Sequence, residues 1–463
     1  MIRKYKQYLL IGLIFFTACS PTDDSSPLPE DFFVKFYGNN SVEAGFDVLV
    51  TENGYLIFGS TNSPELNQSV AGEDSDFYLV FTDLQGNDIK EVVFGTDAED
   101  LPSRIKPTSD GGYIVVGTTT IDEGDYLHTD VIVYKLNAEG AIAPSWPITY
   151  GFDKTTPFAG EDSEDSNEFG YDIVEASDGN YVVLGTTNNV SKDKDNPNPT
   201  LDKQDIYMIK IASSDADPEH PIIWERVTGF ENGNDQGRAL ININNGLAIM
   251  GQTNVDKDGA GTGSNIIFLT TDEEGLDSQF KVFGSGDETN EIGSKMKKTS
   301  DGGVVIVGTA TSAAGNRSIL MKVTASRTLT FFETMSIGEL DGEGNRSQDV
   351  FINNYGYDVE ELSTGGYLIV GKRTGGTLEG DPSGDDIYVI KTDPFGKITE
   401  GTSPALKAGL FDKKYGGLGN DQANAIVELP SGKLMLAGTL DFGGTNSTMM
   451  MLMKVNRNGD LLR

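Results

Sequence analysis

Short apolar runs that end in glycine recur along the whole chain. Seven such runs, from GYLIFG to KLMLAG, end at Gly59, Gly117, Gly185, Gly251, Gly308, Gly371 and Gly438. Successive glycines of this set lie 57 to 68 residues apart. A spacing this regular indicates seven copies of one structural unit.

Each unit has the same order of strand and turn signals. In the third unit, a strand over 171–174 leads into the turn Ser177-Asp178-Gly179-Asn180 and then into the apolar run. A third strand follows over 205–210, and a fourth over 224–229. The Asp-Gly turns supply the positive φ that tight hairpins need, and β-branched and aromatic residues fill the strands.

Four antiparallel strands in each of seven units predict an all-β fold, a seven-bladed β-propeller over residues 32–463. The apolar runs do not alternate with polar residues, which is typical of sheets buried on both faces between neighbouring blades. The segment 32–38 has a fourth-strand pattern with no unit before it, and the last unit stops after a third strand near 449–455. The N-terminal strand is therefore predicted to complete the seventh blade and to remove its open edge.

The first 18 residues have the pattern of a secretory signal, with basic Arg3, Lys4 and Lys6 before a short apolar stretch. The sequence Phe16-Thr17-Ala18-Cys19 resembles a bacterial lipobox, in which the cysteine is diacylated. Cys19 is the only cysteine of the chain, and residues 19–31 are predicted to form a flexible polar tether. This predicts a lipid anchor at Cys19 in the outer membrane, with the propeller on the cell surface or in the periplasm. An ordinary signal peptide followed by a chance cysteine is the alternative.

The repeat itself resembles a known group. Its pattern G-x-D-I-V, then D-G-G-Y-x-V-x-G-T and D-x-Y-x-x-K, is similar to that of propeller-repeat lipoproteins of Bacteroidota envelopes, over roughly residues 31 to 463. The resemblance implies the fold and the envelope location. It implies no active-site residues, because the motif positions are turns and core strands.

Composition narrows the function further. The chain has 71 acidic and 35 basic residues, and its net charge of −36 excludes nucleic acid as a partner. A single cysteine excludes a disulfide framework, and two histidines leave little material for a zinc centre. No nucleophile elbow, phosphate loop or HExxH pattern is present in the sequence. Carboxylate pairs are uninformative here, since so many acidic residues produce accidental pairs.

The connections after the second and fourth strands share one end of the propeller, which we call the loop-rich face. They include 151–170, 187–204, 253–264, 338–356 and 374–385, whereas the opposite, short-turn face carries the Asp-Gly turns. Long loops on a rigid scaffold often carry binding sites. The candidate binding residues of this face are Tyr126, His128, Phe152, Phe158, Phe230, Phe351 and Tyr355. The alternative is that the aromatic rings fill the spaces between blades.

One loop of this face has oxygen ligands at the spacing of a calcium loop. Asn254, Asp256 and Asp258 occupy positions one, three and five of an EF-hand pattern, and Gly259 occupies position six. Position twelve is Asn265 rather than the usual glutamate. Calcium is therefore the one candidate cofactor, and an ordinary acidic hairpin loop explains the same residues.

These observations together predict a non-catalytic, outer-membrane-anchored lipoprotein that acts as a protein-binding scaffold, for example as an accessory subunit of a larger outer-membrane complex. Two alternatives remain. One is a glycan-binding surface lipoprotein that serves polysaccharide uptake. The other is a carbohydrate-active enzyme, a glycoside hydrolase or lyase, that uses carboxylates on the loop-rich face.

Overall fold

The computed structural model describes the propeller region with gaps in its connections. The described residues are 32–39, 41–66, 74–122, 124, 127–151, 166–188, 204–214, 219–230, 233–244, 246–255, 263–276, 279–286, 289–340, 346–374, 384–398, 411–417, 419–443 and 447–461. The predicted signal, Cys19 and the tether therefore lie outside the described residues. Within the described part of the chain, no helix has the length and apolar character needed to cross a bilayer.

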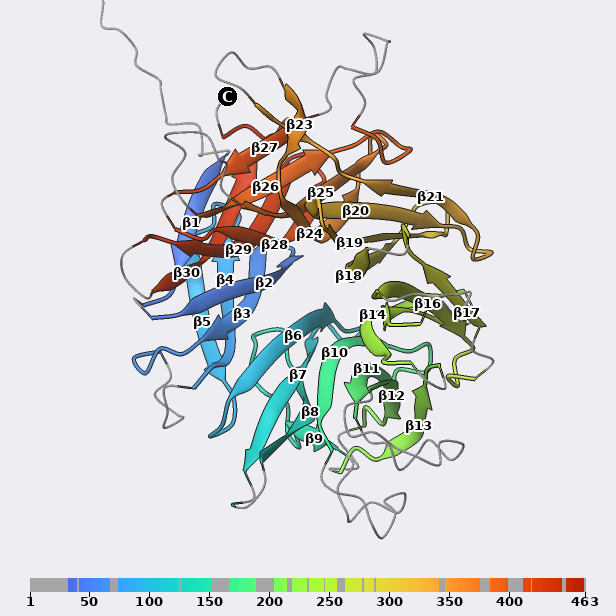
Figure 1. Ribbon diagram of the computed structural model, residues 1–463. Helices are drawn as coiled ribbons and strands as arrows, with labels where there is room; N and C mark the ends of the chain where they lie inside the picture. The colour runs from blue at the N-terminus through green and yellow to red at the C-terminus, as the bar shows by residue number, and fades with distance from the viewer. Residues whose placement is uncertain are drawn as a thin grey trace, which may run out of the picture.

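Seven sheets of four antiparallel strands stand around one axis (Figure 1), which confirms the predicted fold class. The inner strands are β2 (Glu43–Val50), β6 (Asp100–Pro107), β10 (Glu168–Glu175), β14 (Gln236–Ile243), β18 (Asn290–Lys298), β24 (Asn354–Glu361) and β28 (Gln422–Glu428). The second strands are β3 (Gly54–Thr61), β7 (Tyr113–Asp122), β11 (Tyr181–Thr187), β15 (Gly246–Thr253), β19 (Val304–Ser312), β25 (Tyr367–Thr374) and β29 (Leu434–Asp441). We number the blades 1 to 7 in this order.

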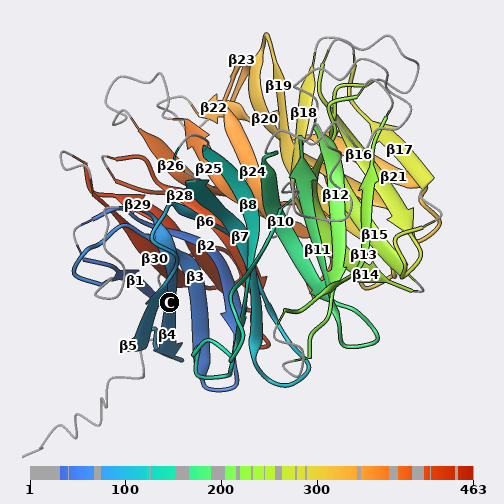
Figure 2. The ribbon, with the colours of Figure 1, turned by 90° about the horizontal axis from the view of Figure 1, so that it is seen from below.

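The outer half of each blade follows the same order. The third strands are β4 (Asp76–Asp83), β8 (Leu127–Leu136), β12 (Asp205–Ile211), β16 (Asn265–Thr271), β20 (Gly315–Val323), β26 (Asp385–Lys391) and β30 (Thr448–Val455). The outermost strands of blades 1 to 6 are β5 (Asp88–Phe94), β9 (Ile148–Tyr150), β13 (Ile222–Thr228), β17 (Gln279–Phe283), β21 (Leu329–Thr334) and β27 (Phe411–Tyr415). The strands run between the two ends of the ring (Figure 2).

The N-terminal strand closes the ring, as predicted. Strand β1 (Phe33–Tyr37) pairs antiparallel with β30, with Phe33 opposite Lys454 and Tyr37 opposite Met450. Blade 7 therefore takes its outermost strand from the start of the chain and its other three strands from the end. This pairing ties the two ends of the propeller together and satisfies the edge of the last blade.

The second strands form the core between blades. Every residue of β3 and β11 is buried, and Leu56, Ile57 and Phe58 are fully buried. Burial on both faces explains why these runs are apolar throughout rather than alternating, since each face packs on a neighbouring blade. Removing each such side chain from water contributes ~1.5–3 kcal/mol.

The two repeated glycines of the sequence meet where blades pack. A Cβ at Gly170 of β10 would lie 2.4 Å from the carbonyl oxygen of Gly117 in β7, and one at Gly237 of β14 would lie 2.7 Å from that of Gly185 in β11. The inner strand of one blade therefore approaches the second strand of the preceding blade too closely for any side chain. This contact explains why both glycines belong to the repeat.

Two connections differ from the sequence-based expectation. The segment 338–356, predicted as a loop, contains a small hairpin of β22 (Gly338–Leu340) and β23 (Arg346–Phe351). On the short-turn face, predicted to carry only short turns, the connection between β26 and β27 runs from 392 to 410. The 392–410 connection begins with the same turn as the other third strands, with the Gly396 N–H bonded to the carbonyl of Asp393, but it is longer than the repeat pattern predicts.

Candidate functional site

Every inner strand has a β-bulge at the same place. The register of the pairing with the second strand breaks between Gly45 and Asp47 in β2, between Gly170 and Asp172 in β10, and at the equivalent pair in the other five blades. The bulge leaves one residue per blade out of the ladder. These seven residues, the axial ring, are Phe46, Ser103, Tyr171, Arg238, Ser294, Tyr357 and Asn424.

The bulge separates two environments that are one residue apart. All seven side chains of the axial ring are partly exposed, whereas the residue that follows each of them is buried in every blade. A bulge re-aims a side chain and is common next to functional sites. Because the inner strands surround the axis (Figure 1), the fold brings seven side chains from distant parts of the sequence to one level of the ring.

Arg238 and Tyr171 are in contact within the axial ring. The Arg238 guanidinium carbon lies 4.6 Å from the centroid of the Tyr171 ring, which is a cation–π distance. Its Nη2 donates a hydrogen bond to Gln236, and its Nε is buried without a hydrogen-bond partner. Among the described residues, no carboxylate forms an ion pair with Arg238. In a chain of net charge −36, an arginine held by an amide and an aromatic ring is available to an anionic ligand.

Tyr357 brings a titratable group to the axial ring. Burial raises the pKa of its phenol, and the ammonium group of Lys372 beside it partly offsets that effect. Lys372 Nζ lies 2.6 Å from Asp385 Oδ2 and 5.2 Å from the centroid of the Tyr355 ring, and Asn316 Nδ2 donates to the Tyr355 hydroxyl at 2.7 Å. Tyr357 is therefore a protonated phenol at neutral pH, next to a fixed positive charge.

The residues that follow the axial ring form a charged layer. They are Asp47, Arg104, Asp172, Lys295 and Asp358 in five blades, with Ala239 and Ala425 in the other two. Arg104 lies 3.4 Å from Asp47 and 3.6 Å from Asp172, so it links blades 1, 2 and 3. Where the next blade has alanine, the carboxylate accepts a backbone N–H instead, Asp172 from Leu240 and Asp358 from Ile426, both at 2.9 Å.

One ion pair of the charged layer crosses the axis. Lys295 Nζ of blade 5 lies 3.2 Å from Asp47 Oδ2 of blade 1, and these blades are not neighbours. Burial alone would raise the pKa of Asp47, but Lys295 and Arg104 lower it to about 2. Burial and the nearby Arg104 lower the pKa of Lys295. The pairing of its charges indicates that this layer holds the ring together and is not free to take a ligand.

A second set of acidic residues is buried where the inner strands begin. Glu43, Asp100 and Asp421 are at most 1 % exposed, and burial raises the pKa of each. Asp100 accepts the N–H of Thr96, and Asp421 accepts that of Gly417 at 2.7 Å, which fixes the connection that enters the strand. These carboxyl groups are therefore structural and are closed to a substrate.

The residues predicted from sequence do not converge on one site. His128 of blade 2 is 8 % exposed with Nε2 3.8 Å from Asp130, and Phe230 packs on Phe280 between blades 3 and 4, with ring centroids 5.4 Å apart. Tyr355 lies on an inner strand, two residues before Tyr357. Of these three residues, only Tyr355 is near the axial ring. Phe230 fills the space between two blades, which was the alternative interpretation of the loop aromatic residues.

The remaining predicted residues are described only in part. Tyr126, Phe152, Phe158, Asp256 and Asp258 lie outside the described residues, and Phe351 is described only as the end of β23. Asn254 is exposed and accepts the N–H of Asn234 at 2.7 Å. In the described part of the chain, no group of three or more His, Cys, Asp or Glu residues could hold a metal ion. The calcium loop stays a prediction.

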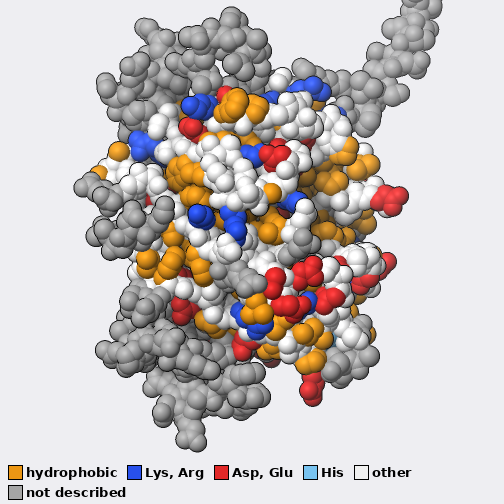
Figure 3. All heavy atoms as spheres, turned by 90° about the vertical axis from the view of Figure 1, so that its right-hand side faces the viewer, with side chains coloured by type: hydrophobic (Ala, Val, Ile, Leu, Met, Phe, Trp, Pro, Cys, Tyr) orange, Lys and Arg blue, Asp and Glu red, His pale blue; other side chains and the backbone are white. Residues whose placement is uncertain are grey.

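One side of the outer wall shows a mixed distribution of side chains. On the side shown in Figure 3, acidic side chains gather mainly in the lower half, and hydrophobic, basic and other side chains are intermingled. Exposed apolar side chains such as Ile222, Ile223 and Leu329 belong to outer strands. The axial ring is therefore the candidate functional site.

The positions of the axial ring can be found in the sequence once the bulge is known. In three blades the sequence G-x-D places the ring residue between a glycine and a buried aspartate, whereas the other four blades read P-S-R, G-R-A, G-S-K and A-N-A at this place. The residue type at this position varies among the blades, so the same backbone presents side chains of different kinds. The bulge that exposes it is visible only in the register of the sheets.

The chain was compared with protein-family models, curated proteins and solved structures. No protein-family model and no curated protein matches the chain. The chain is similar to a PL25 ulvan lyase, with a TM-score of 0.52 and 8 % identity over 93 % of this chain and 98 % of that one. It also resembles the polysaccharide lyase Uly1, with a TM-score of 0.48 and 10 % identity over 91 % of both chains. The α-L-arabinanase of Penicillium chrysogenum has a TM-score of 0.44 and 12 % identity over 77 % of this chain and 93 % of that one.

These findings correct the predicted function. The choice of a non-catalytic, protein-binding scaffold is contradicted, because the solved structure that the chain resembles with a TM-score of 0.52 is a polysaccharide lyase. The sequence argument failed because it looked for contiguous catalytic motifs, whereas a propeller assembles its side chains from separate blades. At this identity the likeness shows the fold alone, so the function is argued from the residues of this chain.

Proposed function

We propose that this protein is a carbohydrate-active enzyme that acts on an acidic polysaccharide at the axial ring. The observation that carries the proposal is the Arg238 guanidinium, stacked on Tyr171 at 4.6 Å with no carboxylate partner among the described residues. An aromatic face can stack on a sugar ring, and a guanidinium can bind its carboxylate or sulfate with two hydrogen bonds. The similarity to a ulvan lyase supports the same class of reaction.

In this proposal, Tyr357 donates the proton that leaves with the product. Its partly buried phenol is protonated at neutral pH and can give its proton to the glycosidic oxygen while the carbon–oxygen bond breaks, so that the oxygen keeps the bonding pair. The other fragment is completed in one of two ways. Either the hydroxide of a water molecule adds to the carbon and the proton of that water goes to the Tyr357 phenolate, or a neighbouring C–H proton goes to the phenolate and leaves a carbon–carbon double bond. Asp47 is a poor proton donor, because its pKa lies at about 2.

Release of reducing ends from a panel of acidic and neutral polysaccharides tests this function. We expect the wild-type chain to cleave an acidic polysaccharide and the Arg238→Met variant to lose about tenfold or more in kcat/KM. Arg457→Met is the matched control, because it removes one exposed arginine beyond the end of β30 and should leave the rate unchanged. Cleavage of neutral polysaccharides alone, or equal rates for Arg238→Met and wild type, would contradict the proposal.

The role of Tyr357 has its own test. Tyr357→Phe keeps the ring and removes the proton, so we expect kcat to fall about a hundredfold with KM nearly unchanged. Ultraviolet absorbance of the product reports whether a carbon–carbon double bond forms, and therefore distinguishes elimination from hydrolysis. A Tyr357→Phe variant with full kcat would remove Tyr357 from the chemistry.

We also propose that the enzyme is a lipoprotein of the outer membrane of a Gram-negative bacterium, anchored at Cys19. The lipobox resemblance and the envelope-type repeat support this location. Labelling of growing cells with a radioactive fatty acid should modify the wild-type chain and leave Cys19→Ser unlabelled. Equal labelling of the two chains would contradict the anchor site.

A further inference from the structure

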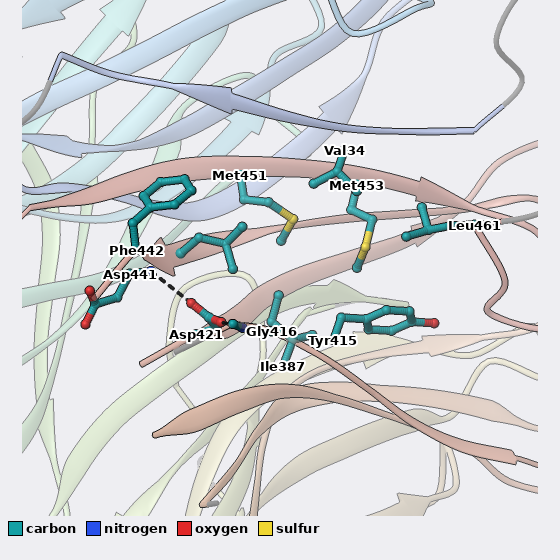
Figure 4. A pocket seen from close by; sticks show the side chains of 12 residues that line it. Val34, Ile387, Tyr415, Gly416, Asp421, Asp441, Phe442, Met451, Met453 and Leu461 are labelled. Carbon is teal, nitrogen blue, oxygen red and sulfur yellow. Dashed lines mark hydrogen bonds between the residues drawn. The ribbon is translucent and has the colours of Figure 1, made fainter. Parts of the chain in front are cut away.

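A separate cavity lies between blades 6 and 7, away from the axial ring. It has a volume of about 330 Å³ and lies between β26 and β27 on one side and β29, β30 and β1 on the other (Figure 4). Its apolar lining is formed by Val34, Ile387, Leu440, Met451, Met453 and Leu461. This volume lies within the range of small-molecule sites, about 300–1,000 Å³.

Methionines line this interface, whereas aromatic rings fill another. Between blades 1 and 2, aromatic rings fill the gap, with the Phe77 and Phe94 centroids 5.3 Å apart and those of Phe94 and Tyr134 4.7 Å apart. Between blades 6 and 7, Met451 and Met453 project from β30 into the cavity. Methionine side chains are unbranched and adaptable, and they suit a binding surface that must accept an apolar chain.

One end of the cavity is acidic and aromatic. Asp421, Asp441 and Phe442 line it, with Asp441 and Phe442 together at one side of the view and Leu461 at the other (Figure 4). Asp441 accepts N–H groups from Asn420 and Gly443. No lysine or arginine of the described residues forms an ion pair with Asp441 or Asp421. Phe442 is 52 % exposed, and its ring meets Phe36 edge-on at 5.4 Å.

We propose that this cavity binds an elongated alkyl chain that carries a cationic head group, such as an alkylammonium. The alkyl chain would lie along Met451 and Met453 toward Leu461. The head group would lie at Asp441, against the face of Phe442, where both the carboxylate and the aromatic ring attract a cation. A fatty acid would bind poorly, because its carboxylate would face Asp441.

Calorimetric titration with three ligands of equal chain length tests this site. We expect decyltrimethylammonium, below its micelle concentration, to bind the full chain at one site, decanol to bind about fivefold more weakly, and decanoate about tenfold more weakly or not at all. Asp441→Asn should reduce the affinity for decyltrimethylammonium about fivefold. The matched control Asp97→Asn removes an exposed charge elsewhere and should leave the affinity unchanged.

Two further variants locate the alkyl chain. Met453→Phe should fill the cavity and abolish binding of decyltrimethylammonium, and Leu461→Trp should narrow the partly exposed far end with little risk to folding. Absence of saturable binding, equal affinity for decanoate, or full affinity in both variants would overturn the proposal. We expect polysaccharide cleavage to be unaffected in each case, because no residue that lines the cavity belongs to the axial ring.

Discussion

The axial ring and the charged layer are consecutive residues of the same seven strands, yet they have opposite properties. Arg238 in the ring has an amide and an aromatic ring as neighbours, whereas Arg104 in the layer lies within 3.6 Å of two carboxylates. The two positions follow the alternation of partly exposed and buried residues along each inner strand, and they lie where the bulge shifts the pairing with the second strand. The comparison indicates that two adjacent positions of each inner strand have different roles, one in binding a ligand and one in stabilising the ring. Four predictions test this separation.

The largest expected effect lies in the charged layer. Lys295→Met removes the ion pair that crosses the axis and leaves Asp47 with Arg104 as its remaining close cation. We expect a loss of about 3 kcal/mol in the free energy of unfolding, because breaking a buried pair leaves a charge that is poorly compensated. Urea denaturation measures it. A loss below about 0.5 kcal/mol would show that the layer does not stabilise the ring.

The pH dependence of stability separates two classes of buried carboxyl group. The pKa of Asp47 is lowered to about 2, so its contribution of ~2 kcal/mol is present above pH ~4 and is lost as the pH falls toward 2. The pKa values of Glu43, Asp100 and Asp421 are raised by burial, so their ionisation costs stability as the pH rises. The melting temperature should therefore be highest in mild acid. A melting temperature that rises steadily from pH 4 to pH 8 would contradict this assignment.

The axial ring should show the reverse pattern from the charged layer. Arg238→Met is expected to leave the free energy of unfolding within about 0.5 kcal/mol of wild type, because no ion pair among the described residues is lost. Its affinity for the polysaccharide should fall about tenfold. Thermal unfolding and a binding isotherm on the same preparation measure both. A strongly destabilised variant would mean that Arg238 belongs to the scaffold.

Asn424 is an exception within the axial ring, because its side chain makes a hydrogen bond between two blades. Its Nδ2 donates to the carbonyl oxygen of Gly45 at 2.7 Å and so links blade 7 to blade 1. Asn424→Ala should cost about 1 kcal/mol of stability, which is ordinary for one hydrogen bond. Ser294→Ala, at the equivalent position of blade 5, is the control and should cost less. Equal costs would show that the contact across the closure is unimportant.

The sequence predicted the fold because its signals are local and repeated. The glycines at the ends of the apolar runs, the Asp-Gly turns and the unmatched first strand each act through a short stretch of chain. Strand β1 pairs with β30 as the pattern indicated. In three blades, the repeated G-x-D also contained both the ring and the layer positions.

The site could not be predicted in the same way. Tyr171, Arg238 and Tyr357 lie on separate blades, and only the closed ring brings such residues to one level. Aromatic residues in loops do not by themselves indicate a binding site, since Phe230 packs on Phe280 between blades, and Tyr126, Phe152 and Phe158 lie outside the described residues. The Asp47–Lys295 pair joins residues 248 positions apart, which no local pattern reveals.

Hydroxyl-radical footprinting of the tyrosines, with and without an acidic oligosaccharide, tests the central claim most directly. The account predicts that the oligosaccharide protects Tyr171 and Tyr357 of the axial ring and leaves Tyr415 of the distant cavity unchanged. It also predicts that this protection disappears in Arg238→Met. Protection confined to residues outside the axial ring, or identical in wild type and Arg238→Met, would contradict the assignment of the ring as the functional site.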